Sequence, residues 1–191
     1  ACTVGSPCSG TVTAGVGNPP TLTVSKAVSA NPLLVGVAGQ YYDITVAIAN
    51  GPSTAPILIT DSLPTGISLA SAPTKQASST SNGVLSGCPV TGGNLTGCQI
   101  ASNASTGTIV IRVPVVVANT ATTGNNTAAA SGGGDPACTV GSPCSGTVTA
   151  GVGNNPIKAN PDAGAPFNGQ PGTAVAGNAY GNDTLGGNPV N

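Results

Sequence analysis

Three side chains of this protein could do chemistry together: Lys26, Asp61 and Asn126. Each falls in a run of alternating residues and shares its face with apolar neighbours, as Lys26 does with Leu22 and Val24. A charged amine among such neighbours is costly unless it is paired. One interpretation is therefore a buried ion pair between Lys26 and Asp61, with Asn126 completing the hydrogen bonds, or a lysine whose long side chain reaches solvent at a sheet edge.

The other interpretation of these three residues is an intramolecular isopeptide bond. An apolar site would hold the amine of Lys26 neutral and nucleophilic, and the side-chain amide of Asn126 would be the electrophile. The carboxylic acid of Asp61 would polarise that amide and shuttle the proton. The sequence leaves both interpretations open, because an error of one residue in the NNTAAAS run would turn Asn126 to the opposite face.

The six cysteines also predict covalent structure. They form three close pairs, and an even count with repeated spacing in a chain without histidine favours disulfides over zinc. Disulfides in turn indicate an oxidising compartment. The expected pairs are Cys2 with Cys8, Cys88 with Cys98, and Cys138 with Cys144.

Enzymatic activity is not expected. With no His and no Glu, neither a Ser-His-Asp arrangement nor a glutamate acid/base pair can be assembled, and five scattered aspartates are a small set for catalysis. A calcium site needs clustered acidic oxygens, and Asp183 beside Asn182 and Thr184 is better explained as a turn. We therefore predict no catalytic residues, no cofactor and no metal.

The charge balance restricts the partners. Four basic and five acidic residues give a net charge of −1, so nucleic acid and acidic membranes are poor partners for this surface. The sequence contains no apolar run long enough to span a membrane, and we expect no membrane insertion of this segment.

The elements that must position these residues are strands. Val, Ile, Thr, Gly, Ser, Asn and Pro dominate the sequence, and alternation of apolar and polar residues recurs between turn signals. The middle part, from Leu69 to Ala101, is expected to form long loops around short edge strands, and Pro114 suggests an edge strand or a bulge. The longer strands are expected at 21–29, 41–51, 56–66, 107–120, 125–133 and 144–152.

These features predict an all-β chain, folded as an immunoglobulin-like antiparallel β-sandwich of about seven to nine strands and repeated in tandem. The repetition is visible directly, because ACTVGSPCSGTVTAGVGN at 1–18 returns unchanged at 137–154. We expect 1–18 to be the terminal hairpin of a preceding repeat and 19–156 a complete repeat. Residues 157–191 would be an incomplete next domain or a docking arm.

Several motifs carry a family resemblance. The lysine of TLTVSKAVS, the NGPS turn, the TDSLPTG segment and the later NNTAAASGGGDPACT resemble the immunoglobulin-like repeat of bacterial surface proteins catalogued as domain of unknown function eleven. This resemblance covers roughly 19–154. The tail, with YGNDTLGGNPV, is similar to the start of cadherin-like repeats in bacterial adhesins. The resemblance implies a large extracellular or cell-surface protein without enzymatic activity.

The expected function is thus structural. The chain would be a repeat of a large extracellular bacterial fibre or adhesin stalk that provides length, stiffness and resistance, with neighbouring repeats as its partners. One alternative is a filament subunit that adds a strand to other copies of itself. The other is a ligand-binding adhesin module, which an exposed aromatic cluster between Leu69 and Ala101 would favour.

Overall fold

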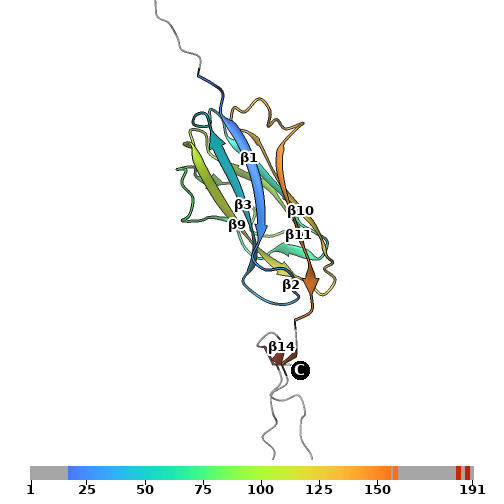
Figure 1. The fold of residues 1–191 in the computed structure, drawn as a ribbon. Helices are drawn as coiled ribbons and strands as arrows, with labels where there is room; N and C mark the ends of the chain where they lie inside the picture. Colours follow the sequence, from blue (N-terminus) through green and yellow to red (C-terminus); the bar gives the residue numbers. More distant parts are fainter. Residues whose placement is uncertain (1–16, 156, 159–183, 186–187, 190–191) are drawn as a thin grey trace, which may run out of the picture.

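In the computed structural model, which describes residues 17–155, 157–158, 184–185 and 188–189, the regular structure is entirely β. Two five-stranded antiparallel sheets pack face to face, so the predicted all-β antiparallel sandwich is confirmed (Figure 1). The first sheet has the order β1–β3–β9–β5, with β6 also paired to β9. Its strands are β1 (Thr21–Val28), β3 (Gln40–Ala49), β9 (Gly107–Val117), β5 (Ile67–Leu69) and β6 (Thr74–Lys75).

The second sheet has the order β11–β10–β4–β8–β7. Its central strands run antiparallel throughout, and β8 carries an irregularity where it passes Asp61 of β4. Its strands are β11 (Cys144–Ala150), β10 (Gly124–Gly132), β4 (Ile57–Ser62), β8 (Asn94–Ile100) and β7 (Leu85–Ser86).

The remaining strands are pairs of residues outside the two sheets. The parallel pair of β2 (Leu33–Leu34) and β12 (Val152–Gly153) fastens the chain where it leaves the sandwich. The backbone N–H of Leu33 donates to the carbonyl of Gly151. In the tail, β14 (Thr184–Leu185) pairs with both β13 (Ile157–Lys158) and β15 (Asn188–Pro189).

The core lies between the two sheets and is built from alternate residues of each long strand. On β3 and β9 every second side chain is buried, as the alternation of the sequence predicts. Tyr42 is the one aromatic residue in this core, which otherwise consists of Ile, Val, Leu, Ala and two cysteines. A core so poor in large rings buries less apolar area per residue, and this favours additional cross-links.

Two expectations about strands need correction. The two sheets together have ten strands, more than the seven to nine expected. The short strands β6 and β7 lie within the segment from Leu69 to Ala101, where short edge strands were expected, but two residues carry no alternation from which their number could be counted. Pro114 does not lie on an edge strand, since β9 has neighbours on both sides. It occupies the gap between β5 and β6, where its carbonyl accepts a hydrogen bond from Ala70 and its missing N–H leaves no strand unpaired.

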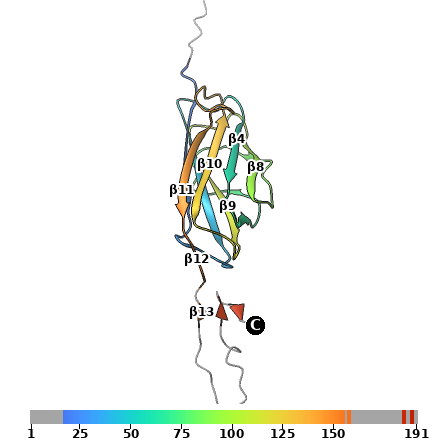
Figure 2. The ribbon, with the colours of Figure 1, turned by 90° about the vertical axis from the view of Figure 1, so that its right-hand side faces the viewer.

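The chain enters and leaves the sandwich at opposite ends of its long axis. Figures 1 and 2 show β1 starting at one end, beside the turn that precedes β11, and β12 leaving at the other. This arrangement allows identical units to follow one another end to end.

Candidate functional site: a buried lysine, aspartate and asparagine

The two sheets bring the three predicted residues together in the core. Lys26 points inward from β1 of the first sheet, whereas Asp61 and Asn126 point inward from the second sheet. Asp61 pairs in register with Ala128, two residues along β10 from Asn126, so both side chains lie on the same face of neighbouring strands. We call Lys26, Asp61, Asn126 and the adjacent Tyr42 the buried cluster.

Lys26 and Asp61 form an ion pair from Nζ to Oδ2. Both side chains have 0 % of their surface exposed. The alternative in which the lysine reaches solvent at a sheet edge is therefore wrong. Breaking a pair with this degree of burial would leave an uncompensated charge in the core, which is strongly destabilising.

Asn126 does not complete the hydrogen bonds of this pair. It is fully buried, yet neither its amide nitrogen nor its amide oxygen has a partner within hydrogen-bond geometry. The same is true of the Tyr42 hydroxyl and of Oδ1 of Asp61. Within the described part of the chain, all buried side-chain polar atoms without a partner belong to this one cluster. Native proteins rarely leave such atoms unsatisfied, so this concentration needs an explanation.

The environment favours the neutral forms of the pair. Burial lowers the pKa of Lys26 in spite of the opposing charge of Asp61. Burial also raises the pKa of Asp61, although Lys26 and the nearby Asn126 amide act in the other direction. A proton passed from the ammonium to the carboxylate would give a neutral amine and a neutral acid, neither of which carries a charge to desolvate.

Tyr42 is the member of the cluster that was not among the three residues singled out from the sequence. Nζ of Lys26 lies 5.0 Å from the centroid of its ring, within the range of a cation–π contact. Burial raises the pKa of Tyr42 to about 12, with Asn126 opposing the shift and Asp61 adding to it. The register of the first sheet places it there, because Tyr42 pairs with Val28, which shares a face with Lys26.

Two of the three expected disulfides fall within the described residues, and both are present. They join Cys88 to Cys98 and Cys138 to Cys144. The expected pair of Cys2 and Cys8 lies outside the described residues, as does Asp183. Disulfides are typical of proteins that fold outside the reducing cytosol.

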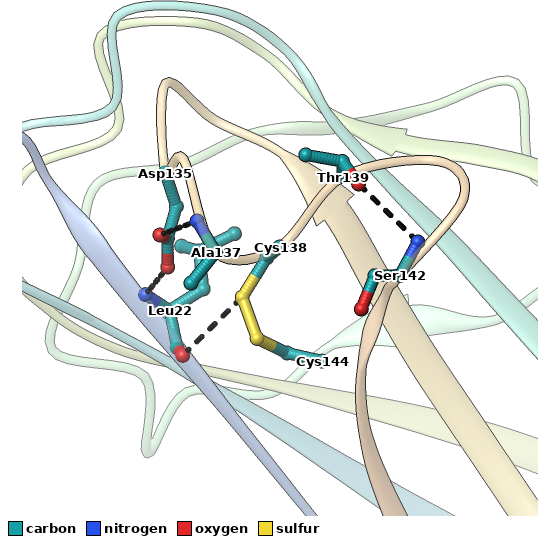
Figure 3. Close-up of a disulfide and its surroundings, with 7 residues drawn as sticks. All are labelled: Leu22, Asp135, Ala137, Cys138, Thr139, Ser142 and Cys144. Carbon is teal, nitrogen blue, oxygen red and sulfur yellow. Dashed lines mark hydrogen bonds between the residues drawn. A yellow bond between two sulfur atoms is a disulfide. The ribbon is translucent and has the colours of Figure 1, made fainter.

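Asp135 is a structural residue that the sequence reasoning missed. Figure 3 shows its carboxylate between two backbone N–H groups: Oδ2 accepts from Leu22 at 2.6 Å and Oδ1 from Ala137 at 2.8 Å. Sγ of Cys138 lies 3.6 Å from the carbonyl oxygen of Leu22. The start of β1 is thereby fastened to the disulfide-closed turn before β11. The available signal was the GGGDP stretch, in which an aspartate follows three glycines and precedes a proline.

Asp135 also lies close to two sulfur atoms, those of Cys138 and Cys144, with all ligand atoms within 4.8 Å of one another. The sulfurs are joined in a disulfide, so they offer no thiolate to a metal. Both carboxylate oxygens accept backbone hydrogen bonds. The contacts of this group therefore fit a structural role.

In the described part of the chain, no helix has the length and apolar character needed to cross a membrane. No protein-family model matches the chain, and no curated protein matches it.

Proposed function

We propose that this chain is a structural repeat of a large extracellular bacterial fibre or adhesin stalk. The observation that carries the proposal is that the chain enters and leaves the sandwich at opposite ends (Figure 1). It is combined with the repetition of the stretch at 1–18, which returns unchanged at 137–154. The first of the two stretches contains the sequence GVG at 15–17, and only three residues, Asn18 to Pro20, separate it from β1. A linker this short and rich in proline restricts bending between units.

Three further features support a role outside the cell. Disulfides persist in oxidising compartments, and they compensate for a core with a single aromatic side chain. The low charge of the chain suits close packing of neighbouring units. Lys26 and Asp61, which belong to the motifs that resemble the repeat of bacterial surface proteins, meet in the buried cluster.

The stalk proposal is tested by shape and by location. Proteins containing one, two and four copies of the 136-residue unit should increase in maximum dimension by equal steps in small-angle X-ray scattering. An antibody raised against 19–156 should label intact, unpermeabilised cells of the producing organism. Equal dimensions for two and four copies, or label found only after permeabilisation, would contradict the proposal.

The same samples test the two alternatives. A filament subunit would form ordered fibres in negative-stain images as the concentration rises, whereas a stalk would remain as separate rods. The ligand-binding alternative has little support, because the segment from Leu69 to Ala101 contains no Phe, Tyr or Trp. Tyr41 lies on the outer face of the first sheet, but its ring is covered by the guanidinium of Arg112, whose Cζ lies 3.5 Å from the ring centroid. This ring face is therefore not free to bind a ligand.

A further inference from the structure

We propose that Lys26 and Asn126 are joined by an intramolecular isopeptide bond that forms within the buried cluster, with Asp61 as the proton carrier. The proposal goes beyond the stalk function and does not depend on it. Of the two interpretations of the sequence, it selects the covalent one.

The strongest argument is the unsatisfied amide of Asn126. The amide of Asn126 is buried with no partner in hydrogen-bond geometry, so it loses the hydration of two N–H donors and one carbonyl oxygen without a well-formed hydrogen bond in return. Asp61 and Tyr42 are the polar groups that interact with it. Loss of the NH₂ group as ammonia removes both of the unpaired donors from the core. The new secondary amide retains one N–H, close to the carboxyl of Asp61, which has an oxygen to spare.

The arrangement of the nucleophile is the second argument. The amine of Lys26 is held at Asp61 by the ion pair, and Asn126 lies two positions along β10 from the register partner of Asp61. The pKa directions at Lys26 and Asp61 both favour transfer of the proton from nitrogen to carboxylate. A neutral amine is the nucleophilic form, and a protonated carboxyl can donate to the amide oxygen.

The reaction balances with the groups present. Asp61 takes a proton from the Lys26 ammonium, and the free amine attacks Cγ of Asn126 while the Asp61 acid hydrogen-bonds the developing oxyanion. The Nζ–Cγ bond forms as the Cγ–Nδ2 bond breaks. The second proton lost by Nζ passes through Asp61 to the leaving nitrogen, which departs as ammonia. No oxidant or other co-reactant is needed.

The surroundings also protect the product. The side chains of the reacting pair are fully buried, so water has no access to hydrolyse the new amide. The bond replaces a buried charged group with a neutral one. It would tie the first strand of the unit, in one sheet, to β10 in the other sheet and close a loop between two residues that are 100 positions apart in the sequence.

The test is the intact mass of the chain, measured by mass spectrometry after reduction of the disulfides and unfolding. We expect a mass one ammonia below that of the sequence. Trypsin should fail to cleave after Lys26 and should give a branched peptide made of 1–75 and 113–158. A mass equal to that of the sequence, with separate peptides 1–26 and 27–75, would overturn the proposal.

Two sets of variants identify the origin of the lost ammonia. Asn126→Ala, Lys26→Met and Asp61→Asn should each restore the full mass and normal cleavage, whereas Lys75→Arg should keep the deficit. The Lys26→Met variant matters because Asn50–Gly51 and Asn82–Gly83 can lose ammonia by forming succinimides, a reaction that requires no lysine, so a deficit of that origin would persist in this variant. A deficit that persists in Asn126→Ala would contradict the assignment.

The buried charge left by a single substitution could prevent folding, so the double variant Lys26→Met/Asp61→Asn removes both charges at once. It should fold, show the full mass and give no branched peptide. The mass measurement is independent of where the protein is displayed. Failure of the bond and failure of the stalk proposal are therefore separate results.

Discussion

Lys26 on β1 and Asp61 on β4 form an ion pair across the two sheets of the sandwich, with both side chains excluded from solvent. A pair at this depth is poor evidence for stability in itself, since desolvation offsets much of the attraction. Its value here lies in holding an amine beside an unpaired amide. The buried cluster therefore stabilises the sandwich mainly through the covalent bond that it can form.

Asn126→Ala separates the covalent from the non-covalent arrangement. Without a cross-link, removal of an unpaired buried amide should be close to neutral or stabilising. If the wild type carries the cross-link, the substitution opens a closed loop of about 100 residues. The chain-entropy model puts the resulting loss in the free energy of unfolding at about 4 to 5 kcal/mol, or about 10 to 20 °C in Tm. We expect the large loss by differential scanning calorimetry. Asn125→Ala, on the exposed face of the same strand, should change Tm little.

Tyr42→Phe should remove an alkaline loss of stability. Tyr42 keeps its proton up to about pH 12 in the folded protein, against 10.0 when unperturbed. The folded state therefore binds the additional proton between these values. This contribution is complete below pH 10 and is lost as the pH rises towards 12, by at most about 2 to 3 kcal/mol.

Urea unfolding between pH 8 and 11.5 measures this difference. The wild type should lose stability over that range more steeply than Tyr42→Phe. At pH 7 the variant should be at least as stable as the wild type, because the hydroxyl that it lacks is buried in the wild type without a hydrogen-bond partner. Tyr41→Phe, on the outer face under Arg112, should follow the wild type. Parallel pH profiles for wild type and Tyr42→Phe would contradict the assignment.

Gly146→Ala should force the sandwich open beside the buried cluster. A Cβ at Gly146 would lie 2.7 Å from the carbonyl oxygen of Val24 and 2.8 Å from Cα of Ser25, so β1 must move away from β11. We expect a cost of about 1 to 3 kcal/mol in chemical unfolding, together with slower or incomplete loss of ammonia. Gly141→Ala, where no described atom lies within 4 Å of the added carbon, is the matched control and should do neither.

Asp135→Ala should loosen the start of β1. The substitution removes two charge-assisted hydrogen bonds and leaves the buried N–H of Leu22 without a partner (Figure 3). We expect a loss of about 2 to 4 kcal/mol in the free energy of unfolding, and faster hydrogen exchange at Leu22. Asp43→Ala, which breaks the partly buried ion pair with Arg112 on the outer face of the first sheet, should have a smaller effect. Equal effects of the two substitutions would show that the hydrogen bonds of Asp135 to Leu22 and Ala137 do not contribute specially to stability.

The cross-link should also shield most of the unit from tension. Force applied at the two ends is carried through the first strand to Lys26 and through β12, β11 and β10 to Asn126, and the loop between these two residues cannot extend while the bond is intact. In single-molecule pulling, Asn126→Ala should release roughly 300 Å more than the wild type. This length corresponds to about 90 residues, since the Cys88–Cys98 disulfide withholds ten in both proteins. Equal extensions would exclude a covalent bond.

Much of the fold could be predicted because strand alternation is a local property. The faces of the strands around Tyr42, Ile59 and Ile111 follow from a period of two, and each of these side chains is buried as that period requires. The disulfides of the described region follow from short spacing. Short edge strands could be expected between Leu69 and Ala101, but the positions of two-residue strands such as β6 and β7 could not be predicted, since two residues contain no period.

The sequence by itself determined which faces Lys26 and Asp61 occupy, because parity needs only neighbouring residues. It predicted the face of Asn126 as well, but in the NNTAAAS run a shift of one residue would have reversed that face. It did not determine that the three meet. That depended on the register between β4 and β10 and on how the two sheets stack. The hydrogen bond from Leu22 to Asp135 likewise joins residues that are 113 positions apart in the sequence. Tertiary packing alone decided these contacts, since side chains from different sheets meet only when both sheets are complete.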